Sequence, residues 1–396
     1  MSELNYLEKL LDGVEVEWKT LGSIAELKRG TSITKKDVID GTIPVVAGGR
    51  TPAYYHNTSN RDGQTIVIAG SGAYAGFVSW WEEPIFVSDA FTVKPHNILL
   101  PRYCYHFLMN MQQQLHDFKS GGGVPHVYPR DVSPILIPIP CPDNPEKSLA
   151  IQSEIVRILD KFTALTAELT AELTMRKKQY NYYRDQLLSF DEGEVEWKAL
   201  GEVAKIQRGA SPRPIVNYLT EQGNGIPWIK IGDTIPGSKY IDKTLQKITA
   251  EGAQKSRILN PGDFVISNSM SFGRPYILRI TGAIHDGWAS ISNFGEKLNA
   301  DYLYHYLSSK KVKNYWESKI NSGSVSNLNA DIIKTLPVPL PDKQKQERIS
   351  ALLDKFDTLT NSITEGLPRE IELRQKQYEY YRDLLFSFPT PETVSN

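Results

Sequence analysis

The sequence repeats itself over most of its length, and this duplication restricts the possible folds more than any other feature. Residues 16–32 read VEWKTLGSIAELKRGTS, residues 195–211 read VEWKALGEVAKIQRGAS, and the two align without a gap. Two further blocks recur: LDKFTALT (159–166) as LDKFDTLT (353–360), and RKKQYNYYRDQLLSF (176–190) as RQKQYEYYRDLLFSF (374–388). The period of about 200 residues is far longer than that of a solenoid repeat. The chain is therefore predicted to be a tandem duplication of one domain with an appended segment.

The body of each half mixes strands and helices. The strand-like runs are residues 65–68, 85–87 and 264–267, and the helical stretches are residues 103–115 and 301–313. Each half closes on an alternating proline segment, ILIPIPCP (135–142) or LPVPLP (336–341), which predicts an edge strand or an extended connector. Each half is therefore predicted to be a compact α+β domain whose loops carry the variation.

A long apolar seam follows each domain. It consists of Ile151, Ile155, Ile158, Phe162, Leu165, Leu169, Leu173, Tyr180, Tyr183 and Leu187 in the first half, and of Ile349, Leu352, Phe356, Leu359, Ile363, Leu367, Ile371, Tyr378, Tyr381 and Leu385 in the second. Steps of three and four residues are typical of a coiled coil, and a helix from residue 151 to 187 would be on the order of 55 Å long. The two seams are expected to pack antiparallel. Gly366 and Pro368 predict that the second helix kinks or restarts.

The two ends of the chain carry pieces of one repeat. YLEKLLDGVEVEW (6–18) echoes YRDQLLSFDEGEVEW (183–197), so the chain begins with the tail of a helix whose body lies at the C-terminus. The predicted fold class is α+β, with two globular α+β domains separated by two long antiparallel coiled-coil helices in a pseudo-twofold circular arrangement. The predicted boundaries are an N-terminal helical segment (1–12), a first domain (13–142), a central coiled-coil region (143–192), a second domain (193–342), a C-terminal coiled-coil region (343–389) and a tail (390–396).

Composition limits what the chain binds and where it works. The formal net charge is −1, so nucleic-acid binding would need local basic patches or help from a partner. Cys104 and Cys141 are too few for a disulfide framework or a cysteine-rich zinc site. The N-terminus has no apolar signal-peptide core, and prolines break the longest apolar stretch, 135–141, which argues against a membrane span. These features predict a cytoplasmic protein with reduced thiols.

The sequence contains no recognisable catalytic motif. It lacks the [ND]-P-P-[YF] motif of adenine methylation, a glycine loop for S-adenosylmethionine and a G-x-x-x-x-G-K-[ST] phosphate loop. The seven histidines show no metal-ligand spacing. Residues 142–147 lack the spacing of a PD-(D/E)xK nuclease, and a pair of His126 and Asp131 has no nucleophile or counterpart in the second half to support it. The chain is predicted not to be an enzyme.

The order, spacing and duplication of these motifs resemble the specificity (S) subunit of type I restriction-modification systems over essentially the whole chain. The resemblance is closest to the type IC group, and it rests on TAELTAEL (166–173), the blocks at 176–190 and 374–388, and EGLPREIELRQ (365–375). It implies two target-recognition domains, each of which reads one half of an asymmetric bipartite site in double-stranded DNA across an unread spacer. It also implies that the helical regions dock two methyltransferase subunits, which methylate adenine, and that restriction subunits then join to cleave DNA. S-adenosylmethionine, ATP and Mg²⁺ are then expected on the partner subunits, with no cofactor in this chain, in a bacterial cytoplasm.

DNA recognition needs basic groups for phosphates and polar side chains on loops for base edges. In the first domain the candidates are Lys28, Arg29, Thr31, Ser32, Lys35, Lys36, Arg50, Tyr54, His56, Ser71, Tyr74, Lys119 and His126. In the second they are Arg208, Ser211, Arg213, Lys230, Asn268, Ser269, Arg274, His285, Asn321, Ser324 and Asn327. His106 and His305 lie in apolar helical stretches and are interpreted as structural. Docking of partner subunits is expected at Tyr180, Tyr183, Arg184, Tyr378, Tyr381 and Arg382.

The TAEL tetrads predict a ruler. Four added helical residues advance a helix by about 6 Å and turn it by a net angle of about 40°. One added base pair advances DNA by about 3.4 Å and turns it by about 35°. The angles nearly agree although the rises do not, so one added tetrad is predicted to lengthen the tolerated DNA spacer by one base pair. The tetrads also extend the coiled-coil seam, and the two interpretations are compatible.

One alternative function stays open. A coiled-coil scaffold that joins two protein-binding domains without DNA fits the duplication and the seam equally well. The basic, glycine-rich loops and the family resemblance argue against it.

Overall fold

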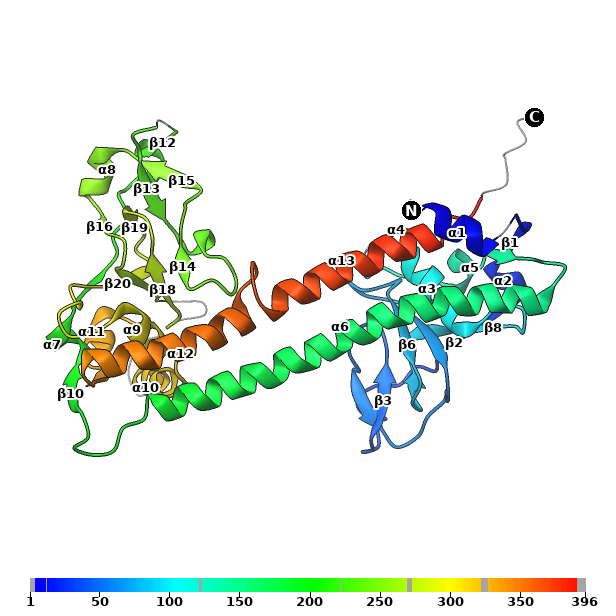
Figure 1. Cartoon of the computed structure of the whole chain (residues 1–396), viewed down its shortest axis with the longest axis horizontal. Helices are drawn as coiled ribbons and strands as arrows, with labels where there is room; N and C mark the ends of the chain where they lie inside the picture. The colour runs from blue at the N-terminus through cyan, green and yellow to red at the C-terminus, as the bar shows by residue number, and fades with distance from the viewer. Residues whose placement is uncertain are drawn as a thin grey trace. The chain divides into compact units, whose positions relative to one another are not determined.

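The computed structural model describes residues 4–11, 13–120, 123–221, 223–268, 273–321 and 327–389. The chain divides into two compact units, of which unit 1 comprises Met1–Ala167 and Leu373–Asn396, and unit 2 comprises Glu168–Glu372. Each unit combines a mixed helix and strand domain with parts of the long helices (Figure 1). Among the described residues, no helix is both long and apolar enough to cross a membrane.

Unit 1 contains three small sheets. Its strands are β1 (Val16–Thr20), β2 (Ala25–Arg29), β3 (Ile43–Val46), β4 (Tyr54–His56), β5 (Thr65–Ala69), β6 (Val78–Trp81), β7 (Phe86–Val87), β8 (Ala90–Pro95) and β9 (Leu136–Pro140). They form a four-stranded sheet in the order β2-β8-β5-β6, a three-stranded sheet β4-β3-β7 and the antiparallel pair β1-β9. The helices are α1 (Leu4–Leu11), α2 (Leu21–Ile24), α3 (Pro101–Asn110), α4 (Gln112–Asp117), α5 (Pro129–Val132) and the first part of α6 (Pro145–Leu187).

Unit 2 repeats this plan with larger sheets. Its strands are β10 (Glu196–Ala199), β11 (Lys205–Arg208), β12 (Leu219–Thr220), β13 (Ile226–Ile229), β14 (Tyr240–Ile241), β15 (Gln246–Ile248), β16 (Arg257–Leu259), β17 (Phe264–Ser267), β18 (Pro275–Leu278), β19 (Gly282–Ile284), β20 (Trp288–Ser292) and β21 (Pro337–Leu340). They form the sheets β11-β20-β17-β18-β14 and β12-β15-β13-β19-β16, and the pair β10-β21. The helices are α7 (Leu200–Val203), η1 (Ile215–Asn217), η2 (Ile231–Asp233), α8 (Ala250–Gln254), α9 (Ala300–Leu307), α10 (Lys310–Asn321), α11 (Ala330–Lys334) and α12 (Lys343–Asn361), followed by the start of α13 (Leu367–Leu385).

The proline segments are edge strands, as the sequence predicts. β9 and β21 each pair with one strand only, so the missing N–H groups of their prolines leave no second ladder incomplete. The register is the same in both halves, since Trp18 lies opposite Pro138 and Trp197 lies opposite Pro339. Each pair ties the start of a domain to its end.

The helices confirm a restart in the second seam and correct the start of the first. α6 begins at Pro145 rather than at Ile151 and runs for 43 residues, because Asn144 caps it by accepting the Lys147 N–H at 3.0 Å and proline suits the first helical turn. α12 ends at Asn361, and α13 begins at Leu367 after Gly366, whose φ is +81°. A side chain at Gly366 would lie 2.4 Å from the Thr358 carbonyl oxygen, so glycine is required at this break.

Within each unit the long helices run antiparallel, side by side (Figure 1). In unit 1, Phe162 of α6 stacks on Tyr381 of α13 with ring centroids 5.2 Å apart. In unit 2, Phe356 of α12 stacks on Tyr183 of α6 at 5.6 Å. These contacts join residues that the seam pattern selects, and they confirm coiled-coil-like packing at these points.

The core of unit 1 includes both ends of the chain. Leu7 and Leu11 of α1 belong to the same buried cluster as Leu385, Phe386 and Phe388 at the end of α13. The N-terminal segment therefore completes the end of a helix that the C-terminal part of the chain supplies, as a circular arrangement requires.

Candidate nucleic-acid interface

In unit 2, five of the predicted DNA-binding residues contact Asp286, which was not among the predicted residues: three contact its carboxylate and two contact its backbone carbonyl oxygen. The Ser211 hydroxyl donates to Asp286 Oδ1 at 2.8 Å, Arg213 Nη2 donates to Oδ2 at 3.3 Å, and His285 Nε2 lies 3.1 Å from Oδ1. Arg208 Nε and Asn268 Nδ2 donate to the Asp286 carbonyl oxygen at 3.4 and 3.2 Å. Asp286 thus holds loops from three parts of the sequence in one cluster.

The sheet explains why these loops meet. β20 lies between β11 and β17, with Arg208 opposite Ala289 and Ser267 opposite Trp288. The ends of β11 and β17 and the beginning of β20 therefore share one sheet edge, and the three loops leave from it. Gly209 permits this approach, since a side chain there would lie 2.1 Å from the His285 carbonyl oxygen.

The electrostatics of the cluster leave an exposed cation next to an anion. Burial tends to raise the pKa of Asp286, but the Ser211 hydrogen bond and the charges of His285 and Arg213 outweigh it and lower that pKa below its usual value. Asp286 is therefore ionised at neutral pH. The Arg213 side chain is 82% exposed, so its guanidinium is oriented by Asp286 and still accessible from solvent.

Unit 1 has the corresponding edge with a different set of side chains. β8 lies between β2 and β5, with Arg29 opposite Phe91 and Ala69 opposite Ala90. The Ser71 hydroxyl donates to the Asp89 carboxylate just before β8, as Ser211 does to Asp286 before β20. A serine and an aspartate therefore meet at the same sheet edge in both units.

Several basic side chains of unit 1 lie against aromatic rings. Arg29 lies 5.3 Å and Arg130 lies 4.7 Å from the centroid of the Tyr128 ring, on which His126 stacks at 5.7 Å. His126 also forms a backbone bridge with Ser71, which brings the loop after β5 to this cluster. A second group has Arg50 placed 4.9 Å from the centroid of the Tyr74 ring. Both groups combine exposed guanidinium with an aromatic face.

Several other candidates form hydrogen bonds that hold the loops. His56 is 7% exposed, and its Nδ1 accepts the Ile39 N–H at 3.0 Å, so its burial corrects the interpretation of this side chain as a DNA contact. Ser71 is also buried, with its hydroxyl on Asp89. Lys119 Nζ donates to the Ala73 carbonyl oxygen at 3.0 Å, and Lys230 Nζ donates to Gln246 Oε1 at 2.7 Å.

The remaining candidates divide by exposure. Lys28, Thr31, Ser32, Lys35, Lys36, Arg274 and Asn327 are exposed, and Tyr54 is half-buried in β4. Ser269, Ser324 and the side chain of Asn321 lie outside the described residues.

Four residues of these clusters were not among the predicted ones: Asp89, Asp286, Tyr128 and Arg130. Two of them could have been found in the sequence, because each half has an aspartate just before β8 or β20, in VSDAF and HDGWA.

A comparison with known protein families identifies the family to which the chain belongs. The family model described as "Type I restriction modification DNA specificity domain" matches residues 13–175 and again residues 192–373. The chain belongs to this family.

Relatives and solved structures agree with this assignment. The chain is 42% identical to the specificity subunit of the type I restriction enzyme EcoR124I/EcoR124II of Escherichia coli over 426 aligned positions, which cover 100% of both proteins. It is 34% identical to a putative type I restriction enzyme specificity subunit of Haemophilus influenzae, with 97% of this chain and 98% of the relative covered. The fold is similar to the crystal structure of the type I S subunit of M. genitalium, with a TM-score of 0.60 at 17% identity over 96% of this chain and 98% of that one.

The chain is thus the DNA specificity component of a type I system and not an enzyme itself. The duplicated domains and long antiparallel helices predicted from sequence are the fold of such subunits. Within the described part of the chain, no group of three or more His, Cys, Asp or Glu side chains is arranged to hold a metal ion.

Some of the side chains predicted to dock partner subunits are buried in this subunit. Tyr180 and Arg184 are only 5% and 8% exposed, so these side chains are part of the subunit interior. Tyr378 donates its hydroxyl hydrogen bond inward, and Arg382 Nε donates to Asn110 Oδ1 at 3.0 Å. Of the predicted aromatic residues Tyr183 is exposed, and Tyr182 and Tyr380, which were not predicted, are exposed as well.

His106 and His305 are fully buried, which confirms that they are structural. His305 Nε2 lies 2.8 Å from Asp354 Oδ1, and Lys239 Nζ lies 2.7 Å from the same oxygen. Burial tends to raise the pKa of Asp354, but the hydrogen bonds from His305 and Lys239 and the lysine charge lower it. This ionised carboxylate is therefore a partner of two otherwise buried groups.

Replacing Asp354 with alanine is expected to lower the free energy of unfolding of unit 2 by about 2 kcal/mol. Removing one partner of a fully buried ion pair costs about 3–5 kcal/mol, and the 34% exposure of the Asp354 side chain reduces this figure. Since the folded-state pKa is depressed, the contribution is complete above the unfolded pKa of about 3.9 and is lost as the pH falls through the lower folded value. Urea unfolding of the full chain, followed from pH 7 to pH 3, measures it. Asp242→Ala, which breaks a half-exposed pair with Arg279, should cost less than about 1 kcal/mol at every pH.

Proposed function

We propose that this specificity subunit reads an asymmetric, bipartite site in double-stranded DNA, one half with each recognition domain. The sheet-edge cluster found in both units carries the proposal. In unit 2 the cluster combines the exposed Arg213 with the pair of Ser211 and Asp286, and in unit 1 the exposed Arg29 lies at the sheet edge where Ser71 meets Asp89. Arginine, serine and aspartate are side-chain types that hydrogen-bond base edges, and arginine also binds phosphates. Because the two clusters differ in their other residues, the two half-sites are expected to differ in sequence.

The proposal assigns separate tasks to the domains and the helices. Recognition domains at 13–142 and 193–342 read the bases, and the helical regions at 143–192 and 343–389 set the spacer. The exposed tyrosines of the helices dock two methyltransferase subunits, and restriction subunits join that complex. S-adenosylmethionine, ATP and Mg²⁺ bind to these partner subunits.

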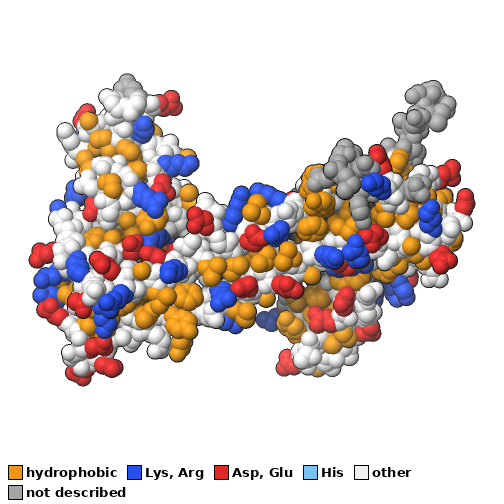
Figure 2. Space-filling view, viewed as in Figure 1, with side chains coloured by type: hydrophobic (Ala, Val, Ile, Leu, Met, Phe, Trp, Pro, Cys, Tyr) orange, Lys and Arg blue, Asp and Glu red, His pale blue; other side chains and the backbone are white. Residues whose placement is uncertain are grey.

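Charge supports a role for partners in DNA affinity. The net charge is −1, and basic and acidic side chains are interspersed over the visible face of each unit (Figure 2). Without a field of one sign, few counterions are released on DNA binding, so the subunit alone should bind weakly. Fluorescence anisotropy with a labelled duplex, with and without the methyltransferase subunits, tests this. If the assembled complex shows no preference for any DNA sequence, the chain is a scaffold and the proposal is wrong.

Replacing Arg50 or Arg274 with alanine is expected to weaken specific DNA binding by the assembled complex about tenfold, the effect of losing one good base contact. Both side chains are exposed and lie against a tyrosine ring, so the melting temperature and the subunit assembly should not change. Affinity for specific and scrambled duplexes at two salt concentrations measures the effect. A base contact changes only the specific affinity, whereas a phosphate contact changes both and reduces the salt dependence. Unchanged affinity for both duplexes removes the residue from the interface.

A further inference from the structure

A three-residue network around a buried histidine connects the domain of unit 1 to both of its long helices. His106 of α3 is fully buried, and its Nε2 lies 2.8 Å from Asp160 Oδ1 on α6. Its Nδ1 lies 2.9 Å from the Tyr378 hydroxyl oxygen on α13. One imidazole ring therefore bonds a domain helix to the two helices that carry it.

Unit 2 contains the same network at the equivalent positions of the repeat. His305 of α9 is fully buried, with its Nε2 2.8 Å from Asp354 Oδ1 on α12 and its Nδ1 2.9 Å from the Tyr180 hydroxyl oxygen on α6. The aspartates come from the two LDKF blocks and the tyrosines from the two QYxYYRD blocks. Two of the three recurring blocks of the duplicated sequence thus meet at one histidine ring in each unit.

The contacts of His106 fit a neutral ring in unit 1. In that state Nε2–H donates to the Asp160 carboxylate and Nδ1 accepts from the Tyr378 hydroxyl. Burial lowers the pKa of His106, and burial raises the pKa values of Tyr180 and Tyr378, so these groups stay neutral at physiological pH. All polar atoms of the ring have partners, and each bond has a defined direction.

The two networks differ in how the aspartate is neutralised. In unit 1, Arg102 lies one helical turn before His106 and donates to Asp160 at 2.8 Å. The equivalent position in unit 2 is Asp301, of opposite charge. Lys239, from the loop before β14, lies 2.7 Å from both Asp301 and Asp354 and is 8% exposed. Lys239 therefore supplies the positive charge that Arg102 supplies in unit 1.

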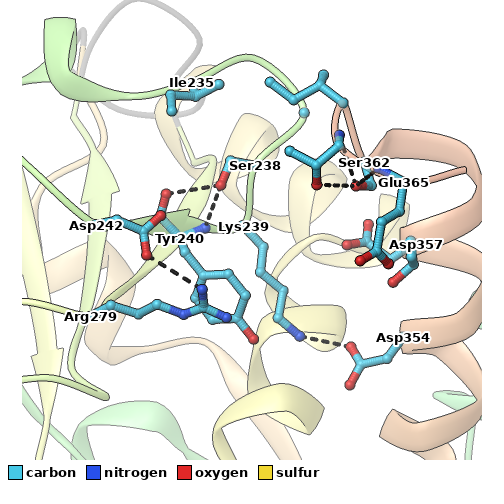
Figure 3. A pocket seen from close by; sticks show the side chains of 14 residues that line it. Ile235, Ser238, Lys239, Tyr240, Asp242, Arg279, Asp354, Asp357, Ser362 and Glu365 are labelled. Carbon is cyan, nitrogen blue, oxygen red and sulfur yellow. Dashed lines mark hydrogen bonds and ion pairs between the residues drawn. The ribbon is translucent and has the colours of Figure 1, made fainter. Parts of the chain in front are cut away.

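Lys239 lies where a cavity separates part of the domain from the end of α12. It lines a cavity of about 570 Å³ between the loop at 235–242 and the end of α12, with Tyr240, Arg279, Asp354, Asp357 and Glu365 (Figure 3). In Figure 3 the Lys239 side chain extends from the sheet to Asp354 on α12. The apolar cluster that includes Ile349 and Leu353 joins α12 to the domain elsewhere, and the ion pairs of Lys239 connect the loop at 235–242 to α12 beside this cavity.

We propose that these His–Asp–Tyr networks, completed by Arg102 or Lys239, are latches that fix the orientation of each recognition domain on the helices and thereby define the spacer length that the subunit accepts. The residues are positioning residues that need not touch DNA. The proposal rests on the bipartite reading proposed above. A domain that rocks on its helices would still read its half-site but would tolerate a neighbouring spacing.

The test uses the complex assembled with its methyltransferase subunits and a series of duplexes. Both half-sites are kept constant, and the spacer has the preferred length or one base pair more or less. The measured quantity is the ratio of methylation rates at the preferred and the altered spacing. Tyr180→Phe and Tyr378→Phe remove one hydroxyl each and should lower this ratio about fivefold, the effect of one hydrogen bond. Tyr315→Phe, which removes one hydroxyl hydrogen bond to the Thr335 carbonyl oxygen inside the unit 2 domain, is the matched control and should leave the ratio unchanged.

A charge exchange provides a rescue. Lys239→Ala leaves Asp301 and Asp354 without their shared cation and should lower the ratio about tenfold, as two charged hydrogen bonds are lost. Lys239→Ala combined with Asp301→Arg recreates the pairing of unit 1 and should restore the ratio to within about twofold of wild type.

The outcomes separate the latch from the proposed function. If the wild-type complex methylates no bipartite site, the proposed function fails. If the wild type prefers one spacing and the Tyr180→Phe, Tyr378→Phe and Lys239→Ala variants lose activity equally at all spacings, the network only stabilises the fold and the latch is overturned. Failure of Asp301→Arg to rescue Lys239→Ala also overturns the role of Lys239.

Discussion

Replacing Asp286 with alanine is expected to lower the affinity of the assembled complex for its specific site by between about 10-fold and 100-fold, the range for losing one or two base-pair readouts. The carboxylate receives hydrogen bonds from Ser211 and Arg213 and lies beside His285, so its removal frees three side chains at once. The exposed Arg213 loses its orientation in particular, since an arginine without a partner must be ordered by the DNA itself.

Scrambled duplexes separate the contributions of the two half-sites. Affinity is measured for the complete site and for duplexes in which either half is scrambled. In the wild type, scrambling either half lowers affinity; in Asp286→Ala, scrambling the half that unit 2 reads should lower affinity by about 10-fold to 100-fold less than in the wild type. Asp242→Ala removes another carboxylate paired with an arginine in the same unit and should retain both effects in full. An Asp286→Ala variant in which scrambling either half lowers affinity as much as in the wild type would exclude the sheet-edge cluster from base recognition.

The stability of the variant must also be unchanged for this interpretation. Asp286 contributes no apolar contact to the core of unit 2, and its pairs are partly exposed. Its loss is therefore expected to change the free energy of unfolding by less than about 1 kcal/mol. Circular dichroism and the melting temperature check this.

The sequence predicted the features that depend on local pattern and on repetition. Steps of three and four along the seam predicted that the two seams pack antiparallel, and the contacts of Phe162 with Tyr381 and of Phe356 with Tyr183 join residues of the two seams. Gly366 predicted the helix restart because its backbone conformation excludes other residues. Alternating prolines predicted edge strands for the same kind of local reason.

The parts that sequence reasoning missed depend on contacts between distant residues. Asp286 is separated from Ser211 by a difference of 75 in residue number, and only the order β11-β20-β17 brings them together. The charge reversal from Arg102 to Asp301 is visible in an alignment of the two halves, but its compensation by Lys239 depends on where the loop before β14 lies. Tyr180 was assigned both to the seam and to the docking surface because its block is rich in aromatic residues, and its burial and its hydroxyl bond to His305 favour the intramolecular role.

Inserting one further TAEL after Leu173 is expected to move the preferred DNA spacer to one base pair more, and deleting one tetrad to one base pair less. The tandem tetrads at 166–173 lie inside the uninterrupted helix α6, and the division between the two units falls between Ala167 and Glu168, within the tetrads. An insertion there therefore changes the helix between the two recognition domains without touching either latch. The added net turn of about 40° is close to the turn of about 35° for one base pair. Methylation of the spacer series by the assembled complex measures the shift.

A three-residue insertion is the control for the effect of helix rotation. Inserting only three residues, TAE, turns the helix by about 300°, which leaves it about 60° short of a full turn and so opposite in sense to an added base pair. That variant should methylate no member of the series efficiently, although it lengthens the helix by nearly as much as TAEL does. If TAE and TAEL insertions shift the spacer equally, length rather than rotation sets the spacing. If neither shifts it, the long helix is not the ruler, and the orientation of the recognition domains must be set by the bound methyltransferase subunits.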